Sequence, residues 1–158
     1  MSEVEELSFR EKSALVSLLA VLFVYGGYFV NLLSGSAEHT LSAMLYTSIG
    51  VVITLVVIEI VFHSLLSSFD AADANAPADE RDLLISARAA RVSHLVLSSG
   101  VLIVLGRVVI GGAMFESNGL EEVTLFEVAN LLLFAFVASE LSHYGAQIFF
   151  YRRGLGYA

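Results

Sequence analysis

The chain of 158 residues contains no cysteine, a single proline and few charged residues. The absence of cysteine excludes disulfides, thiol catalysis, thiolate metal ligands and iron–sulfur clusters. Only 15% of the residues are charged and 57% are hydrophobic, whereas soluble domains have about 25% charged and about 45–50% apolar residues. Together with a mean hydropathy of +0.80, this composition indicates a membrane protein.

Basic residues are scarce: the chain has eight Lys and Arg and sixteen Asp and Glu, which gives a net charge of −8. An acidic, mostly apolar chain of this kind excludes nucleic acid as a main partner, and its few basic residues fit contact with anionic lipid. The sequence has neither a Gly-x-Ser-x-Gly motif nor a Gly-rich phosphate loop, so no motif indicates a serine hydrolase or a phosphate-binding enzyme. Sequence alone therefore assigns no reaction.

Long apolar runs predict an all-α protein, a single domain that forms a bundle of four transmembrane helices. A helix of about 20 residues spans roughly 30 Å, the thickness of one bilayer core. Asp79 is predicted to cap the third helix, and Tyr25 and Tyr28 are predicted to lie in an aromatic belt at the membrane surface. The predicted spans cover residues 14–33, 41–66, 84–112 and 123–151, and a polar loop covers residues 67–82.

The basic residues are sorted by side of the membrane. The two loops on one side hold none, and the positive-inside rule therefore predicts that both termini and the 67–82 loop are cytoplasmic. We expect a protein that crosses the plasma membrane several times and contacts the lipid bilayer. Because the chain is small, we also expect a homo-oligomer or a complex with another membrane protein. Seven of the eight basic residues flank the other side: Arg10, Lys12, Arg81, Arg88, Arg91, Arg152 and Arg153.

Ionisable residues inside the predicted spans lie at one depth, in the cytoplasmic half of the bilayer. Glu59 and His63 are four residues apart on the second span, so they share a helical face. Glu140 and His143 are three residues apart on the fourth span and share a face as well. His94 of the third span lies at a matching depth. Because an ionisable group costs about 2.5–3.5 kcal/mol at a helix centre in the bilayer, we expect these groups to contact one another.

Two carboxylates and three imidazoles at one depth predict a metal site. Carboxylate-bridged di-metal sites in helical bundles use two Glu-x-x-His helices and two more glutamates. This chain has one such motif and one wider pair. Three nitrogen and two oxygen ligands suit Zn²⁺, Mn²⁺ or Fe²⁺. A haem held by two of the histidines is another reading, although the sequence shows no pocket for it.

Two further alternatives need no metal. Glutamate and histidine inside a membrane also relay protons or bind a transported ion, which a protein of four helices would do as an oligomer. In the other alternative the chain is a structural or regulatory subunit, in which Glu59 or Glu140 neutralises a nearby arginine and the histidines hydrogen-bond across helices.

Other polar residues are expected to support these contacts. Tyr144, Gln147 and Tyr151 continue the helical face that carries Glu140 and His143. Arg107 and Glu127 lie at similar depth near the external surface, where they are expected to pair. The remaining candidates for pairing are Arg88, Arg91 and Ser98.

Four short stretches stand out together: Phe9 to Ser13, Ile58-Glu59-Ile60 with His63, Pro77 to Asp82 followed by Leu84, Ile85 and Arg88, and Tyr144-Gly145 with Gln147 and Tyr151 to Gly154. This arrangement resembles a family of small, uncharacterised bacterial membrane proteins with four helices. The resemblance covers nearly the whole chain. It implies a protein of the bacterial inner membrane, and it implies no reaction.

Overall fold

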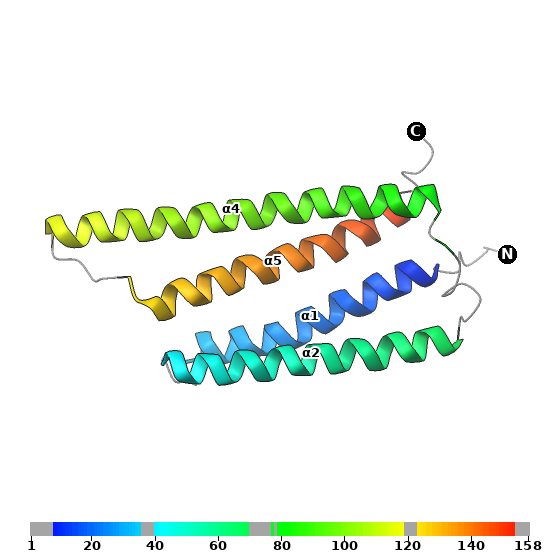
Figure 1. Ribbon diagram of the computed structural model, residues 1–158, viewed down its shortest axis with the longest axis horizontal. Coiled ribbons are helices and arrows are strands. Elements are labelled where there is room, and N and C mark those ends of the chain that lie inside the picture. Colours follow the sequence, from blue (N-terminus) through cyan, green and yellow to red (C-terminus); the bar gives the residue numbers. More distant parts are fainter. Residues whose placement is uncertain (1–7, 36–39, 70–76, 78, 119–122, 154–158) are drawn as a thin grey trace.

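A computed structural model describes residues 8–35, 40–69, 77, 79–118 and 123–153 (Figure 1). Within these ranges nearly every residue is helical and no strand occurs. Each of the four helices is long and apolar enough to cross a membrane, which confirms the prediction of an all-α protein with four candidate spans. The helices are α1 (Phe9–Leu33), α2 (Leu41–Phe69), α4 (Glu80–Asn118) and α5 (Leu125–Arg152).

Most of the helices extend beyond the predicted spans, because backbone hydrogen bonding continues past the apolar run. α1 begins at Phe9, five residues before the predicted span. Its first turn is capped by Ser8, whose side chain accepts a hydrogen bond from the Glu11 backbone N–H at 3.2 Å. At the far end of the second span, α2 continues to Phe69. The connection between α2 and α4 is therefore shorter than the predicted loop.

The start of α4 is a reciprocal cap. The Asp82 backbone N–H donates to the Asp79 carboxylate at 2.7 Å, and the Asp79 N–H donates to the Asp82 carboxylate at 3.3 Å. Each acid thereby satisfies a backbone donor that the helix itself leaves open. The capping role predicted for Asp79 is confirmed, and Asp82 has a larger part in the cap than sequence alone predicted.

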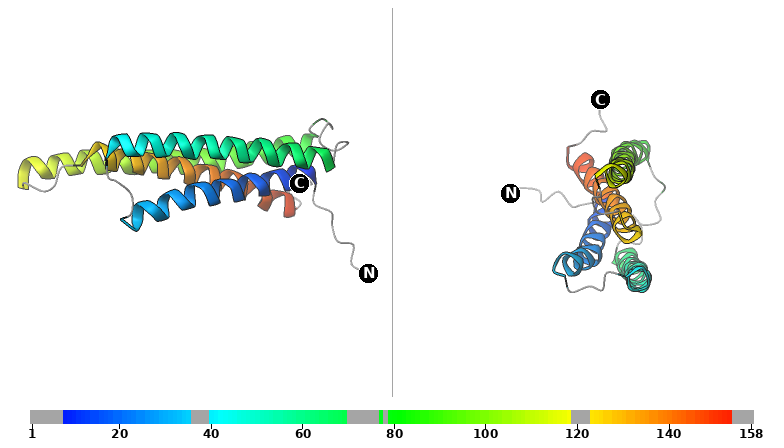
Figure 2. Two further views of the ribbon diagram at one scale, coloured as in Figure 1. Left: turned by 90° about the horizontal axis from the view of Figure 1, so that it is seen from below. Right: turned by 90° about the vertical axis from the view of Figure 1, so that its left-hand side faces the viewer.

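The helices lie side by side in the order α4, α5, α1, α2 (Figures 1 and 2). α5 lies between α4 and α1, whereas α2 packs mainly on α1 and makes a small contact with α5. Within the described ranges α2 and α4 do not contact each other, so they form the two outer edges. α1 and α4 begin, and α2 and α5 end, at one end of the molecule (Figure 1). We call this the basic end, because it carries Arg10, Arg81 and Arg152.

Small and polar side chains bring α4 and α5 close together. The Ser93 and Ser139 hydroxyl oxygens are 2.7 Å apart. Gly100 lies so near Ala135 that a Cβ atom at position 100 would be 2.5 Å from the Ala135 Cβ. Towards the other end, Arg107 and Glu127 form the predicted pair at 3.1 Å. These contacts set the antiparallel register of the two helices.

α1 buries one face against α2 and α5, with buried residues recurring every three or four positions. Tyr25 and Tyr28 belong to this face and are only 4% and 9% exposed. Their assignment to an aromatic belt is therefore wrong. The Tyr28 hydroxyl instead donates to Asn130 Oδ1 on α5 at 2.6 Å, which satisfies both polar groups away from water.

Candidate functional site

Six polar residues of α1, α2 and α5 lie near one another in a group that we call the polar layer: Ser13, Ser17, Glu59, His63, Glu140 and Tyr144. The Ser13 hydroxyl is 3.3 Å from His63 Nδ1, and the Ser17 hydroxyl is 3.5 Å from His63 Nε2. The Ser17 side chain also lies near the Tyr144 phenol group. Since Tyr144 precedes the end of α5 by eight residues, Tyr144 lies roughly 12 Å inside the basic end.

The two glutamates of the polar layer lie on different helices, within electrostatic range of the same tyrosine. Glu59 of α2 and Glu140 of α5 both interact electrostatically with Tyr144. Glu140 also interacts with Tyr25, which is buried on α1. The carboxylates that sequence analysis placed at one depth are therefore close enough to share a partner.

The predicted neutralisation of these glutamates by arginine is not observed. Among the residues that the structure describes, neither Glu59 nor Glu140 forms a salt bridge. Arg91 is exposed on α4, the helix at the edge opposite α2. For Glu59 the helix order explains this result, because α5 separates α4 from the helix that carries Glu59.

The three histidines of the predicted site lie in three different surroundings. His63 contacts the two serines of α1, whereas His143 Nε2 is 3.1 Å from the Gln147 amide nitrogen, one turn along α5. His94 is exposed on α4. The described part of the chain contains no group of three or more His, Asp or Glu side chains that could hold a metal ion. The metal site and the haem reading stay predictions.

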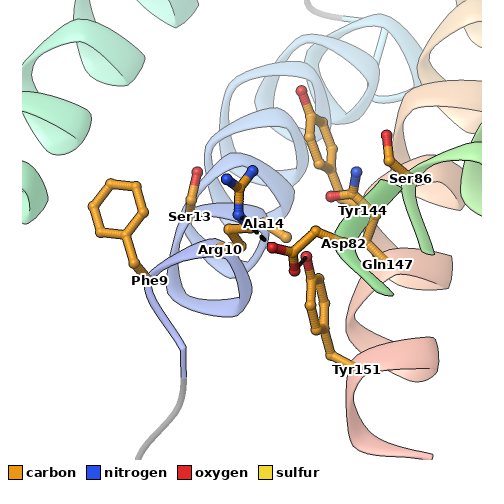
Figure 3. A pocket seen from close by; sticks show the side chains of 9 residues that line it. All are labelled: Phe9, Arg10, Ser13, Ala14, Asp82, Ser86, Tyr144, Gln147 and Tyr151. Atoms are coloured by element: carbon orange, nitrogen blue, oxygen red, sulfur yellow. Dashed lines mark hydrogen bonds and ion pairs between the residues drawn. The ribbon is translucent and has the colours of Figure 1, made fainter. Parts of the chain in front are cut away.

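A pocket of about 250 Å³ opens at the basic end, beside the polar layer (Figure 3). Its lining from α5 consists of Tyr144, Gln147 and Tyr151, which belong to the polar face expected from the sequence. The facing side chains come from α1 and α4, which both pack on α5. The nine residues of the lining are Phe9, Arg10, Ser13, Ala14, Asp82, Ser86, Tyr144, Gln147 and Tyr151. Ser13 and Tyr144 therefore belong to both the pocket and the polar layer.

Asp82 joins three helices at this pocket. Its carboxylate pairs with Arg10 Nε of α1 at 2.9 Å and accepts a hydrogen bond from the Tyr151 hydroxyl of α5 at 2.9 Å (Figure 3). Beside this contact, Arg152 Nε pairs with Glu11 at 3.2 Å. Sequence analysis missed this network. The signal was present, because the predicted topology places all of these residues at the same membrane surface.

An apolar cluster separates the polar layer from the other end of the molecule. Val21, Tyr25 and Val137 form its buried centre, and Leu55 and Leu133 are among the side chains packed against it. Past this cluster lies the hydrogen-bonded pair of Tyr28 and Asn130. The polar layer is thus connected to the pocket at the basic end, and apolar side chains lie between it and the opposite end.

No protein-family model, curated protein or solved structure matches the chain. The resemblance to a family of bacterial membrane proteins therefore stays a prediction. The fold itself supports the coarser conclusion: with four helices that are each able to cross a bilayer, the chain is a multi-pass membrane protein.

Proposed function

We propose that the protein transfers protons in the membrane and loads its polar layer through the pocket at the basic end. The observation that carries this proposal is that a histidine hydrogen-bonded to two serines lies in one layer with two glutamates and a tyrosine, and that this layer shares two residues with the pocket. Glutamate and histidine inside membrane helices are the groups that build proton relays. Hydroxyl groups serve between them because they both donate and accept hydrogen bonds.

The contacts support the following path for the proton. Ser13 lines the pocket and contacts one ring nitrogen of His63, while Ser17 contacts the other. An imidazole in this position accepts a proton on one nitrogen and releases a proton from the other. Tyr144 lies near Ser17 and within electrostatic range of Glu59 and Glu140, and in this proposal the proton moves from Ser17 to Tyr144. These glutamates are the groups that we expect to hold the proton.

The apolar cluster favours proton-coupled transport over an open channel. Val21, Leu133 and Val137 offer no hydrogen bond to a proton that leaves the polar layer towards the other end. The Tyr25 hydroxyl is the one polar side-chain group among the three residues of the buried centre. In this proposal it does not cross the cluster alone, so release to that side requires the helices to move. α2 is the best candidate for the moving helix, because it packs mainly on α1 and has little contact with α5. As expected from the size of the chain, we propose that the working unit is a homo-oligomer, with the basic end in the cytoplasm.

Proton flux into liposomes tests the proposal. The purified protein is reconstituted in vesicles that contain a pH-sensitive dye, and a potassium gradient with valinomycin supplies the driving potential. We expect flux above that of protein-free vesicles, and a loss of about 100-fold or more in Glu59→Gln and Glu140→Gln. Glu80→Gln is the matched control, because Glu80 is exposed at the start of α4, outside the polar layer.

Equal flux in protein vesicles and protein-free vesicles would overturn the proposal. If the two glutamine variants then changed only thermal stability, the polar layer would have a purely structural role. Elemental analysis of the same preparation tests the metal site separately. About one equivalent of Zn, Mn or Fe, lost in His63→Ala, would support that prediction.

A further inference from the structure

The pocket at the basic end presents a cation and an anion to the same space. Arg10 and Asp82 both line it and form an ion pair at 2.9 Å, with 39% and 19% of their side chains exposed (Figure 3). A guanidinium group donates several hydrogen bonds and a carboxylate accepts several. The Asp82 carboxylate also accepts hydrogen bonds from the Tyr151 hydroxyl and the Asp79 N–H. A ligand cation would therefore share this carboxylate with them and with Arg10, and a ligand anion would share the guanidinium group with Asp82.

The rest of the lining is polar and comes from all three helices. Ser13, Ser86 and Gln147 provide hydroxyl and amide groups, and Tyr144 and Tyr151 provide phenol groups. A typical ligand pocket is lined mostly by apolar side chains and contains only a few polar groups. Here they form most of the lining, which favours a small and highly polar ligand.

We propose that this pocket binds a small zwitterion, in which a primary amine is joined to a phosphate group by a short alkyl chain. Arg10 binds the phosphate, since guanidinium groups pair with phosphate through parallel hydrogen bonds. Asp82 binds the ammonium group. Ser13 and Ser86 lie on the two walls, where they complete the hydrogen bonds. A volume of about 250 Å³ accepts a group of the size of phosphoethanolamine.

The pocket lies at the ends of the helices, so such a ligand has two possible sources. One source is the headgroup of phosphatidylethanolamine in the bilayer, and the other is a free aminoalkyl phosphate in solution. Both have the same chemistry, and both place a phosphate and an amine within reach of Arg10 and Asp82. This binding does not depend on the proton transfer proposed above, because the glutamates of the polar layer are absent from the lining.

Binding is measured on the purified full-length protein. In the soluble arm, phosphoethanolamine is titrated into protein in detergent and the midpoint of thermal unfolding is followed. Ethanolamine and inorganic phosphate, each alone at the same ionic strength, are the comparison. In the lipid arm, the unfolding midpoint is compared in nanodiscs of phosphatidylglycerol with and without phosphatidylethanolamine. We expect phosphoethanolamine to raise the midpoint more than either half of the molecule does.

Matched variants locate the binding. Ser86→Trp fills the pocket, whereas Ala87→Trp puts the same side chain at the next position of α4, which is exposed and outside the lining. We expect Ser86→Trp to abolish the response and Ala87→Trp to keep it. Arg10→Gln removes the phosphate partner, and we expect a dissociation constant about tenfold higher or more. Arg10→Gln decides the question if Ser86→Trp does not fold.

The outcomes distinguish a lipid headgroup from a free compound, and they test ligand binding separately from proton transfer. A response only to phosphatidylethanolamine assigns the lipid headgroup, and a response to phosphoethanolamine shows that the free compound also binds. No response to either probe in the wild type would overturn the inference, as would unchanged binding in Arg10→Gln. Glu59→Gln is expected to bind as the wild type does, even where it abolishes proton flux, so the two proposals fail separately.

Discussion

Tyr28 shows how one hydroxyl group sets the position of a side chain in an apolar protein. A tyrosine near the end of a span is typical of an aromatic belt, but Tyr28 points inward to Asn130. Asn130 is itself only 8% exposed, and its amide nitrogen donates to the Phe126 carbonyl at 2.9 Å. A buried amide of this kind requires a partner, and sequence alone does not show that α1 and α5 are neighbours.

Tyr28→Phe is therefore expected to lower stability, because it removes the donor to Asn130 and leaves the ring in place. Hydrogen bonds between membrane helices contribute about 1 kcal/mol or somewhat less. The control is Tyr46→Phe on α2, where the side chain is 76% exposed. Thermal unfolding in detergent, followed by circular dichroism, should give a lower midpoint for the first variant only. Equal midpoints would show that the hydrogen bond adds nothing to stability.

At the scale of the helices, depth was predictable and neighbours were not. Counting along antiparallel spans placed Arg107 within a turn of Glu127, and the two side chains pair. The same counting placed His94 at the depth of the fourth span, but periodicity does not show which face of α4 contacts that span. α2 is mostly apolar on all sides, and Glu59 and His63 are its only acidic or basic residues. The sequence therefore did not show which helix it would contact. It packs on α1 and leaves α4 at the far edge.

Substitution of Gly100 tests whether the packing of α4 against α5 depends on small residues. Gly100→Ala would bring a methyl group to 2.5 Å from the Ala135 Cβ, so the helices must move apart. We expect a loss of stability of about 1–3 kcal/mol, as for other overpacked interfaces. Gly106→Ala is the control on the same helix, since a Cβ there meets nothing within 4 Å. It should be neutral or slightly stabilising, because Ala favours helix over Gly by up to about 1 kcal/mol.

The same pair of variants distinguishes close packing from helix propensity. If both alanines change the unfolding midpoint equally, contact between Gly100 and Ala135 does not hold the two helices together. A selective loss in Gly100→Ala would assign the loss to this contact. The close approach depends on a glycine facing an alanine on another helix, and the match is visible only when the register of the two helices is known.

For the whole molecule, the distribution of charge indicates how it sits in the membrane. Both described chain ends lie at one end (Figure 1), and seven of the eight basic residues belong to the chain segments on that side, with Arg107 the exception. The positive-inside rule predicts that this end is in the cytoplasm. The absence of native cysteine makes this orientation easy to test with Ser34→Cys and Glu80→Cys, both at exposed positions and at opposite ends. In intact cells, a membrane-impermeant maleimide should label the first variant, and the second only after permeabilisation. The reverse pattern would place the pocket outside the cell, where the polar layer would load protons from the external medium.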